Sequence, residues 1–534
     1  MTKLPSRSRT FSVAIVMVFG LTVTANDKLD TGLTDVKRFV GVFVRMSDQL
    51  LGTPKKYKAF CEKNRQRDRR QLRKEVISTL RSKASGSWSK VDKAVQKLVD
   101  NQDVRNIQKY WIVNGFACRA NKAGIEGLAK LPGVEFIYAQ RLVALHKRPM
   151  RRIPARFSQN WKAVYERVIK DWKDDSNDPL KLDGVTIPWN VKRVKADVAW
   201  TKEKATGKGV VVALCDSGLM VTPSLTQTLW RNKKETLNGK DDDNNGFVDD
   251  IFGYDFNLQS WYALGDQRAM THGSMCGGIV AGRSANKKKL LTGIAPRARL
   301  MMLRGMGHLQ QLQYAAANGA DVVSMSYMWV GRRLGNYRGL YRLAHEHLTT
   351  AGVVSVGGAG NFGPGARRRA QPKGRQIALP KDIPCVIAAS GILKSGKPAP
   401  ASSQGPCYWN GVKFYDDFGP KNPLRKPDVT GCFGGYPVWG RPSLARRIPT
   451  WNLLSQESPN IGLVTGPQGN SFSGPHAAGV VALMFSANPK VPAWAIKTLL
   501  EKSCTDIGDK GRDDVFGAGL LNAEKAVQMA KAWK

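Results

Sequence analysis

The stretch Gly469-Asn-Ser-Phe-Ser-Gly-Pro-His-Ala-Ala-Gly479 places Ser471 at the start of a long apolar helix that continues through Val480-Val-Ala-Leu-Met484. The first turn of a helix has N–H groups without partners and a positive dipole end, which would stabilise an oxyanion developing beside Ser471. A serine at a helix start is also an ordinary N-cap. The stretch therefore predicts a helix, and it predicts a nucleophile only if other motifs supply a base.

Two earlier motifs supply a base and a carboxylate. Gly209-Val-Val-Val-Ala-Leu-Cys-Asp-Ser-Gly218 is typical of a buried strand that finishes at Asp216 and turns at glycine. Thr271-His-Gly-Ser-Met-Cys-Gly-Gly-Ile-Val-Ala-Gly282 places His272 at the start of a helix of small residues, which can pack closely on a sheet. Taken singly, the aspartate could cap a turn and the histidine could be an ordinary one. Together with Ser471 they provide the groups that acyl transfer needs, in the order Asp, His, Ser.

A fourth motif offers a hydrogen-bond donor that could stabilise the oxyanion. Val353-Val-Ser-Val-Gly-Gly-Ala-Gly-Asn361 reads as a strand that breaks into a glycine loop. The loop presents the side-chain amide of Asn361, which is a suitable second oxyanion donor beside the backbone N–H of Ser471. Alone, Asn361 would be interpreted as a turn former.

From about residue 184 to the end, short aliphatic strands alternate with helical stretches. Such runs, bounded by glycine or polar residues, suit buried parallel strands. We expect a doubly wound α/β domain over 184–534, with a mainly parallel sheet flanked by helices and active groups at the carboxyl ends of its strands. The expected strands are Val210–Leu214, Leu300–Leu303, Val322–Met325, Val353–Val356 and Val386–Ala389, and the expected helices are Gln310–Asn318 and Leu340–Thr349.

The region from Val185 onward resembles the subtilisin-like serine proteases, on the four motifs above and on further landmarks in the expected order. The resemblance implies a serine endopeptidase that hydrolyses peptide bonds of proteins through an acyl-enzyme. It implies Asp216, His272 and Ser471 as the catalytic triad and Asn361 in the oxyanion hole, with no organic cofactor. The further landmarks are Gly293-Ile-Ala-Pro296, Ser402-Ser-Gln-Gly-Pro406, Lys426-Pro-Asp-Val429 and Phe516-Gly-Ala-Gly-Leu-Leu-Asn-Ala523.

Val322-Val-Ser-Met-Ser326 resembles the substrate-binding edge of the same family. The residues that the resemblance assigns to the substrate are Ser326, Tyr327, Met328, Gly358, Ala359 and Gly360. The sequence departs from the family pattern at Asn470, where threonine is usual, and at Met328, where glycine is frequent. A methionine there could narrow the pocket for the side chain that precedes the cleaved bond.

An acidic stretch, Asp241-Asp-Asp-Asn-Asn-Gly-Phe-Val-Asp-Asp250, lies between the aspartate and histidine motifs. Oxygen-bearing side chains alternate before a glycine, as in calcium loops, although the glutamate of an EF-hand is absent. Similar insertions in subtilisin-like proteases bind calcium, whereas the simpler interpretation is an acidic turn. The predicted calcium ligands are Asp241, Asp243, Asn245, Phe247 and Asp250.

The part before the protease region divides into three segments. Residues 1–25 have a basic start, an apolar stretch and a small-residue cleavage site, which predicts a signal peptide and export to a secreted or periplasmic location. An uncleaved anchor is the alternative, but the stretch is short for a membrane span. Residues 36–145 read as a small α+β unit, and residues 146–183 read as a linker.

The α+β unit is predicted to have helices over 63–83 and 90–99, a strand at Tyr110–Phe116, a helix at Lys122–Leu131 and a strand at Val134–Tyr138. We expect a ferredoxin-like arrangement of helices on a small antiparallel sheet. The unit is similar to the inhibitory prosegment of subtilisin-like proteases, and its place directly before the protease supports this. The expected partners are therefore protein substrates and the chain's own prosegment.

The formal net charge is +41, from 83 Lys and Arg against 42 Asp and Glu. Such a charge favours nucleic acid, anionic surfaces or acidic substrates, but a solvated basic surface is the simpler explanation. The sequence has no zinc-finger spacing or RNA-binding signature, so no specific nucleic acid is expected. Two alternatives stay open: an idle relative that binds proteins or surfaces through its charge, and a purely cationic binder. Export would permit a disulfide among Cys385, Cys407, Cys432 and Cys504.

Overall fold

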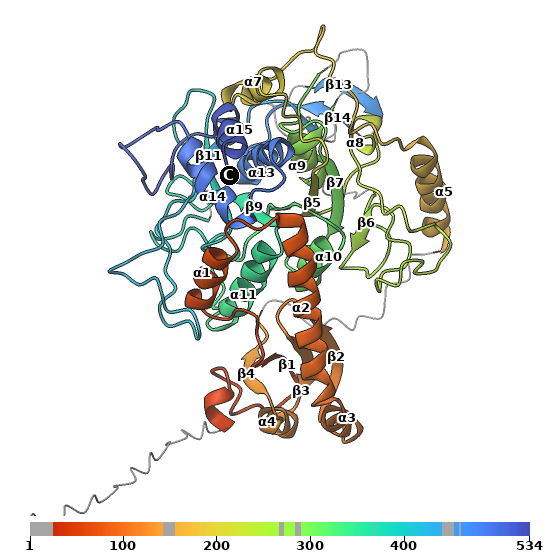
Figure 1. The fold of residues 1–534 in the computed structure, drawn as a ribbon, viewed down its shortest axis with the longest axis vertical. Helices are drawn as coiled ribbons and strands as arrows, with labels where there is room; N and C mark the ends of the chain where they lie inside the picture. Colours follow the sequence, from red (N-terminus) through yellow and green to blue (C-terminus); the bar gives the residue numbers. More distant parts are fainter. Residues whose placement is uncertain are drawn as a thin grey trace, which may run out of the picture.

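The computed structural model describes residues 25–141, 155–265, 272–283, 290–367, 369–440, 453–458 and 461–534. The predicted signal peptide, apart from its last residue, lies outside the described residues. The chain forms a large unit, named the catalytic unit because it carries the predicted catalytic residues, and a smaller N-terminal unit that packs against it (Figure 1). The long helix α2 runs from the smaller unit onto the larger one.

The catalytic unit is built on a seven-stranded sheet in the order β11-β10-β9-β8-β5-β7-β6, and every pair of neighbouring strands is parallel. The predicted doubly wound α/β fold is confirmed, and β8 has the predicted bounds. The strands are β5 Val211–Asp216, β6 Gly253–Asp255, β7 Arg299–Arg304, β8 Val322–Met325, β9 Val354–Gly358, β10 Ile387–Ile392 and β11 Val429–Cys432.

Both faces of this sheet are buried, which explains why its strands are apolar throughout. Successive side chains of a strand point to opposite faces. Val212 and Leu214 of β5 therefore join the core beneath α9 and α13, while Ala213 and Cys215 join the core beneath α10 and α11. The helices are α6 Trp189–Arg193, α7 Ala196–Thr201, α8 Pro223–Thr226, α9 His272–Ala281, α10 Leu309–Ala317, α11 Tyr337–Thr350, α13 Asn470–Ala487, α14 Ala493–Ser503 and α15 Ala523–Lys531. A small antiparallel sheet is formed by β12 Val438–Gly440, β14 Ile461–Val464 and β13 Leu453–Ser458.

The N-terminal unit has a four-stranded antiparallel sheet in the order β2-β3-β1-β4, with helices between the strands. Its elements follow the chain order β, α, β, β, α, β once the three helices after β1 are taken together. They are η1 Ala25–Lys28, β1 Val40–Met46, α1 Pro54–Lys63, α2 Arg69–Ser89, α3 Asp92–Asp100, β2 Val104–Tyr110, β3 Gly115–Ala120, α4 Lys122–Lys130 and β4 Val134–Ala139.

The single strand predicted at Tyr110–Phe116, ending in a turn, is wrong: Tyr110 is the last residue of β2, residues 111–114 form the turn, and Gly115 and Phe116 begin β3. The apolar side chains that suggested a strand, Ile112 and Val113, are buried against the catalytic unit instead. The backbone N–H groups of Trp111 and Ile112 donate to Gln313 Oε1 of α10. Burial at an interface between units gives the same apolar signal as burial in a sheet.

Two arginines of α2 bind the catalytic unit at the amino end of β8. Arg69, with 2% of its side chain exposed, donates to Asp321 Oδ1 at 2.8 Å and to Gly352 O at 2.8 Å. Its guanidinium also lies 4.0 Å from the ring centroid of Phe485. Arg73 reaches the same Asp321 oxygen at 3.3 Å. Removing one partner of such a buried pair typically costs about 3–5 kcal/mol, so this double contact is a main attachment of the N-terminal unit.

His347 of α11 joins the two units through both ring nitrogens. Its Nδ1 lies 2.5 Å from Ile112 O, and its Nε2 accepts the backbone N–H of Leu51 at 3.2 Å. These partners require the neutral ring with its proton on Nδ1. Burial, then the positive charge of Arg45, lowers the pKa of His347 from 6.5 to about 4, with partial compensation from Ile112 O.

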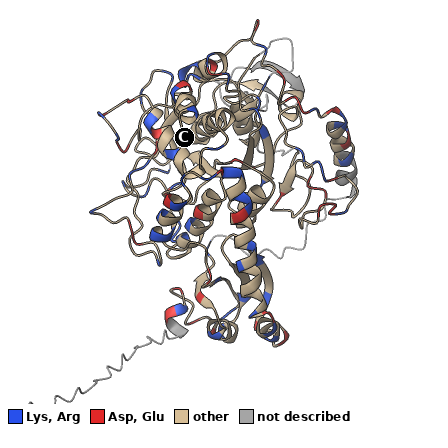
Figure 2. Cartoon of the chain, viewed as in Figure 1, with Lys and Arg blue, Asp and Glu red and all other residues tan. Residues whose placement is uncertain are grey.

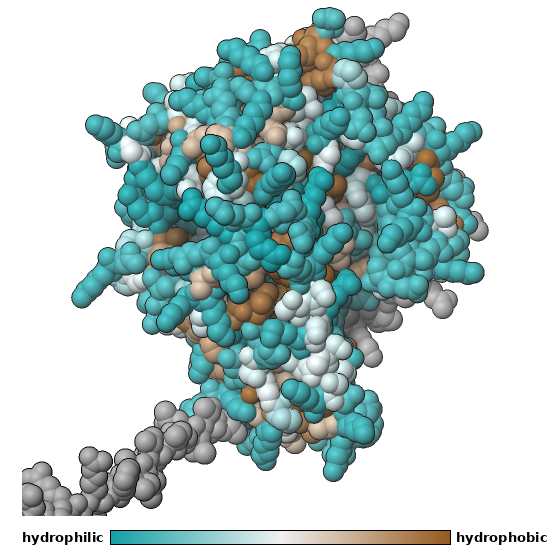
Figure 3. Space-filling model, in the orientation of Figure 1, coloured by the Kyte–Doolittle hydropathy of each residue, from teal (hydrophilic) through white to brown (hydrophobic). Residues whose placement is uncertain are grey.

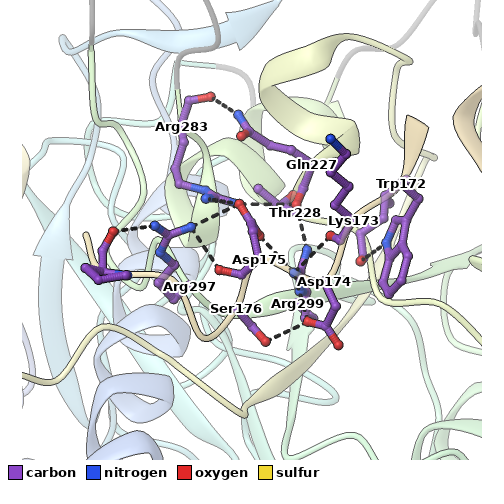
Figure 4. A network of polar contacts seen from close by, with 12 residues as sticks. Trp172, Lys173, Asp174, Asp175, Ser176, Gln227, Thr228, Arg283, Arg297 and Arg299 are labelled. Atoms are coloured by element: carbon purple, nitrogen blue, oxygen red, sulfur yellow. Dashed lines mark hydrogen bonds and ion pairs between the residues drawn. The ribbon is translucent and has the colours of Figure 1, made fainter. Parts of the chain in front are cut away.

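The segment predicted as a linker contains a helix, α5 Ala155–Asp171, and a tightly bound turn after it. Figure 4 shows Asp175 among three arginines of the catalytic unit. Its carboxylate accepts from Arg283 at 2.6 Å, from Arg297 at 3.0 Å and from Arg299 at 2.8 Å. Burial raises the pKa of Asp175, but the hydrogen bond and charges of these arginines outweigh it and hold the pKa below its usual range. The segment is thus an integral part of the catalytic unit rather than a free linker.

Basic side chains are spread over both units rather than gathered in one tail (Figure 2). The face drawn in Figure 3 is mostly hydrophilic. No helix in the described part of the chain has the length and apolar character that a membrane span requires. All eight cysteines are free thiols, so the structure forms no disulfide among the four that the sequence left open.

We predict that His347 makes the stability of the intact chain sensitive to acid. A histidine whose pKa is lowered by folding contributes stability above its unfolded pKa of 6.5, and this is lost as pH falls towards about 4. By this linkage His347 alone accounts for about 2 kcal/mol of stability lost between pH 7 and pH 5. Denaturant unfolding of Ser471→Ala and of Ser471→Ala/His347→Gln at both pH values measures the difference. Equal pH dependence of the two proteins would contradict the assignment.

Candidate active site

Three of the predicted catalytic residues lie at the carboxyl end of the parallel sheet. Asp216 is the last residue of β5, and His272 is the first residue of α9. The imidazole Nδ1 lies 2.8 Å from Asp216 Oδ1 and 3.0 Å from Oδ2. The Ser217 backbone N–H also donates to Asp216 Oδ1 at 2.7 Å. This geometry fixes the carboxylate and orients the imidazole.

The approach of α9 to β5 depends on glycine. A Cβ atom at Gly273 would lie 2.1 Å from Gly218 O, which no side chain could tolerate. The small residues predicted to allow close packing do so along the helix, because a Cβ at Gly277 would approach Leu219, and one at Gly278 would approach Trp439. The sequence thus brings His272 to Asp216 by removing side chains between the two elements.

Ser471 is the second residue of α13, and its position depends on a second close contact. A Cβ at Gly358, the last residue of β9, would lie 1.9 Å from Asn470 O. A Cβ at Gly474 would lie 2.5 Å from Gly358 N. The first turn of α13 therefore lies directly on the end of β9. Ser326 Oγ, just after β8, donates to Ser471 O at 2.9 Å and ties the same turn to the next strand.

Asn361 is held beside this turn by Asn470. The Asn361 Oδ1 accepts the backbone N–H of Asn470 at 2.8 Å, so the NH₂ group of Asn361 is left to donate elsewhere. In return, Asn470 Nδ2 donates to Gly360 O at 2.7 Å and to Ser402 Oγ at 2.9 Å. The asparagine that stands where threonine is usual therefore locks the glycine loop to the helix.

A cleft of about 260 Å³ joins these groups. It brings together all four predicted catalytic residues and five of the six predicted substrate residues. The exception is Ala359, whose side chain is fully buried in the core and whose N–H donates to Ala389 O at 2.8 Å. The cleft is lined by Cys215, Asp216, His272, Met306, Ser326, Tyr327, Met328, Gly358, Gly360, Asn361, Phe362, Arg369 and Ser471.

The aspartate and the histidine shift one another's pKa. Burial lowers the pKa of His272, but the charge of Asp216 and its hydrogen bond raise it more, so that it lies well above 6.5. Burial raises the pKa of Asp216, but His272 lowers it further, and the net shift is downward. The neutral imidazole that general-base action needs is therefore favoured by alkaline pH.

Cys276 lies beneath the imidazole, as the four-residue spacing on a helix predicts. Its Sγ is 3.8 Å from His272 Nδ1, 3.4 Å from Ser326 Oγ and 3.3 Å from Ser471 O. Burial raises the pKa of this thiol. Cys276 is therefore a protonated packing residue that contacts the elements carrying both His272 and Ser471.

The acidic loop gathers three carboxylates, of which two were predicted. Asp241 and Asp243 converge with Glu235, and ligand oxygens of the three lie within 4.8 Å of one another. Asp243 Oδ1 is buried without a hydrogen-bond partner among the described residues. Burial raises the pKa of Glu235, and the charges of Asp250 and Asp243 add to this. Converging oxygens with an unpartnered buried atom fit a hard cation.

The other predicted metal ligands lie beside this group. Asp250 is fully buried and accepts hydrogen bonds from Asn232, Asn245 and Tyr314, so its oxygens already have partners. Asn245 Oδ1 accepts the N–H of Phe247 at 2.8 Å, and the Phe247 ring packs on Tyr314. Within the described loop, Asp250 therefore stabilises the fold around the site and does not belong to the group of three converging carboxylates.

The model of the Subtilase family matches residues 207–519, which is more than half of the chain. The chain belongs to the subtilase family. The match covers the strand that carries Asp216, the helix that carries His272 and the helix that carries Ser471.

Named relatives of this subtilase are proteases. The calcium-dependent protease of Trichormus variabilis is 27% identical over 293 residues, covering 48% of this chain and 40% of the relative. Serine protease AprX of Bacillus subtilis is 25% identical over 363 residues, covering 62% of this chain and 69% of the relative. The solved structure of MycP1 with its N-terminal propeptide removed has 22% sequence identity and a TM-score of 0.44, covering 64% of this chain and 96% of that one. The family match and the named protease relatives place the chain in a family of serine peptidases. This subtilase spans less than half of the calcium-dependent protease.

Some functional residues of this subtilase were not found from the sequence. Asn470 was noticed only as a departure from threonine, and its two hydrogen bonds explain that departure. Glu235 precedes the acidic stretch and follows no ligand spacing, so only the fold brings it to Asp243. Met306 and Arg369 reach the cleft from loops that no motif includes.

Proposed function

We propose that this subtilase is a serine endopeptidase that cleaves proteins through an acyl-enzyme. The observation that carries the proposal is the hydrogen bond between Asp216 and His272 in a cleft that Ser471 and Asn361 also line. Acyl transfer needs a nucleophile, a base and an oriented carboxylate in this relation.

In the proposed reaction, Ser471 Oγ attacks the carbonyl carbon of the substrate while His272 Nε2 accepts the hydroxyl proton. Asp216 holds Nδ1 and stabilises the imidazolium that forms. The tetrahedral oxyanion is bound by the Ser471 backbone N–H and by the NH₂ of Asn361. His272 then protonates the departing amine. Water, activated by the same imidazole, releases the acyl group from Ser471.

We further propose that the chain is made as an exported precursor. The sequence pattern of residues 1–25 supports export, and the docking of the N-terminal unit on α10 and α11 supports a prosegment that stays with its enzyme. Among the described residues, the cleft is lined by the catalytic unit alone. Inhibition by residues 36–145 is therefore a proposal that rests on the family resemblance and on this docking, and not on a contact within the cleft.

Calcium is the proposed ion of the acidic loop. Glu235, Asp241 and Asp243 would supply carboxylate oxygens, and the name of the Trichormus variabilis relative is in keeping with this. Calcium bound there would neutralise three converging negative charges and brace the segment between β5 and α9.

The proposed function is tested by Ser471→Ala, which we expect to lower casein hydrolysis by about 10⁶-fold and to abolish self-processing. Ser486→Ala, at the other end of α13, is the matched control and should retain activity. Equal thermal unfolding of the two variants shows that the fold is kept. Hydrolysis by Ser471→Ala at the control rate would refute Ser471 as the nucleophile and would assign the hydrolysis to another group or to a contaminating protease.

Asn361→Ala should lower kcat by about 10²–10³-fold with little change in KM, because its amide acts on the developing oxyanion. Steady-state kinetics on a chromogenic peptide give both constants. A variant that raises KM alone would show that Asn361 only binds the ground state.

Calcium should stabilise the folded chain, by about 2.7 kcal/mol at a concentration 100-fold above its Kd. Asp243→Asn should remove most of this gain, whereas Asp242→Asn, which changes the neighbouring carboxylate outside the group of three, should keep it. Unfolding of Ser471→Ala backgrounds with calcium and with chelator provides the measurement. No effect of calcium on the wild-type loop would mean that the acidic group serves the fold alone.

A further inference from the structure

The cleft that holds Ser471 has one arginine in its lining. Arg369 is the one arginine or lysine among the side chains that line it. The one lining carboxylate, Asp216, faces His272 Nδ1 with both oxygens. The described lining therefore offers a substrate one guanidinium and no available carboxylate.

Arg369 is held at the cleft by a loop with a fixed base. The loop leaves the cleft wall after Phe362 and returns where the Gln371 N–H donates to Phe362 O at 2.9 Å. Gly363 N–H donates to Ala401 O at 3.0 Å, and Gly365 N–H donates to Pro400 O at 2.8 Å. Arg369 itself is exposed, and in the described part of the chain it forms no ion pair with a carboxylate.

Met328 narrows the cleft. Met328, on the edge that follows β8, lies across Gly360 on the facing edge, since a Cβ at Gly360 would be 2.7 Å from Met328 Sδ. This methionine fills the space between the two edges. Phe362 and Arg369 line the same cleft and offer another place for the substrate side chain.

The backbone carbonyl of Tyr327, a residue that lines the cleft, is hydrogen-bonded to a buried amine. Lys381 is fully buried, and its Nζ donates to Tyr327 O at 2.6 Å. The Tyr327 carbonyl oxygen thus already accepts a hydrogen bond within the protein. A Cβ at Gly357 would lie 2.0 Å from Lys381 Cε, so the glycine makes room for the amine. A basic substrate side chain would meet the Arg369 guanidinium in the cleft and no carboxylate that lacks a partner.

We propose that this subtilase cleaves after acidic residues, with glutamate preferred to aspartate, and that Arg369 pairs with the substrate carboxylate. The inference rests on the proposed peptidase function. Two methylene groups of glutamate would pack on Phe362 and Met328 and carry the carboxylate to the guanidinium, while the shorter aspartate would not reach as far. A charge-assisted pair of this kind provides specificity, because the neutral side-chain amide of a glutamine in place of the glutamate cannot form it.

The test compares four peptides that differ only at the residue before the cleaved bond: glutamate, glutamine, leucine and lysine. We expect kcat/KM for glutamate to exceed that for glutamine by about tenfold at low salt, and the ratio to fall as salt is added. Arg369→Gln should bring the ratio near one, and Arg369→Glu should favour lysine over glutamate. Arg367→Gln is the matched control, because Arg367 is an exposed cation of the same loop that does not line the cleft.

Sequencing of the products confirms which bond is cut. Faster cleavage of leucine or glutamine peptides than of the glutamate peptide, or cleavage at a different bond, would overturn the acidic specificity while leaving the peptidase function in place. An unchanged ratio in Arg369→Gln would overturn the role of Arg369. Failure of Ser471 to react with a fluorophosphonate, together with no cleavage of any peptide, would overturn the proposed function itself.

Discussion

The contact between the first turn of α13 and the end of β9 sets the geometry of the whole active site. At this contact the backbone of Asn470 and the backbone of Gly358 touch without any side chain between them. Because of it, the N–H of Ser471 and the amide of Asn361 lie in one cleft. A methyl group at Gly358 would separate the helix from the sheet, and the nucleophile would lose its place relative to the oxyanion donors.

The parallel sheet brings the other residues of the site to this contact. β5, β8 and β9 end at the same edge, so Asp216, Ser326 and the glycine loop converge although they are far apart in the sequence. Two helices then start at this edge, α9 with His272 and α13 with Ser471. The polar groups are fixed by short hydrogen bonds to backbone rather than by long side chains, which keeps their arrangement rigid before any substrate arrives.

The sequence predicted those parts of the molecule in which local pattern and tertiary role agree. The strands of the parallel sheet are apolar because both faces are buried, and the catalytic motifs lie at the ends of those elements. Prediction failed where packing between units decided the outcome: Ile112 and Val113 are apolar in a turn because they dock on another unit. The sequence also did not show that the Ala359 side chain is buried: the alternation of β9 continues past Gly358 and places it in the same core as Val353. Nor did it predict the place of Glu235, which reaches Asp243 only through the fold of its loop.

The attachment formed by Arg69 and Arg73 lies at the opposite end of β8 from Ser326. A chain cut between the two units would lose covalent continuity but would keep this buried ion pair, the ring contacts of His347 and the apolar interface around Ile112. The nicked molecule would therefore travel as one particle in native chromatography and separate into two bands only under denaturing conditions. The same protein would then show two smaller masses on a denaturing gel and one larger mass in solution.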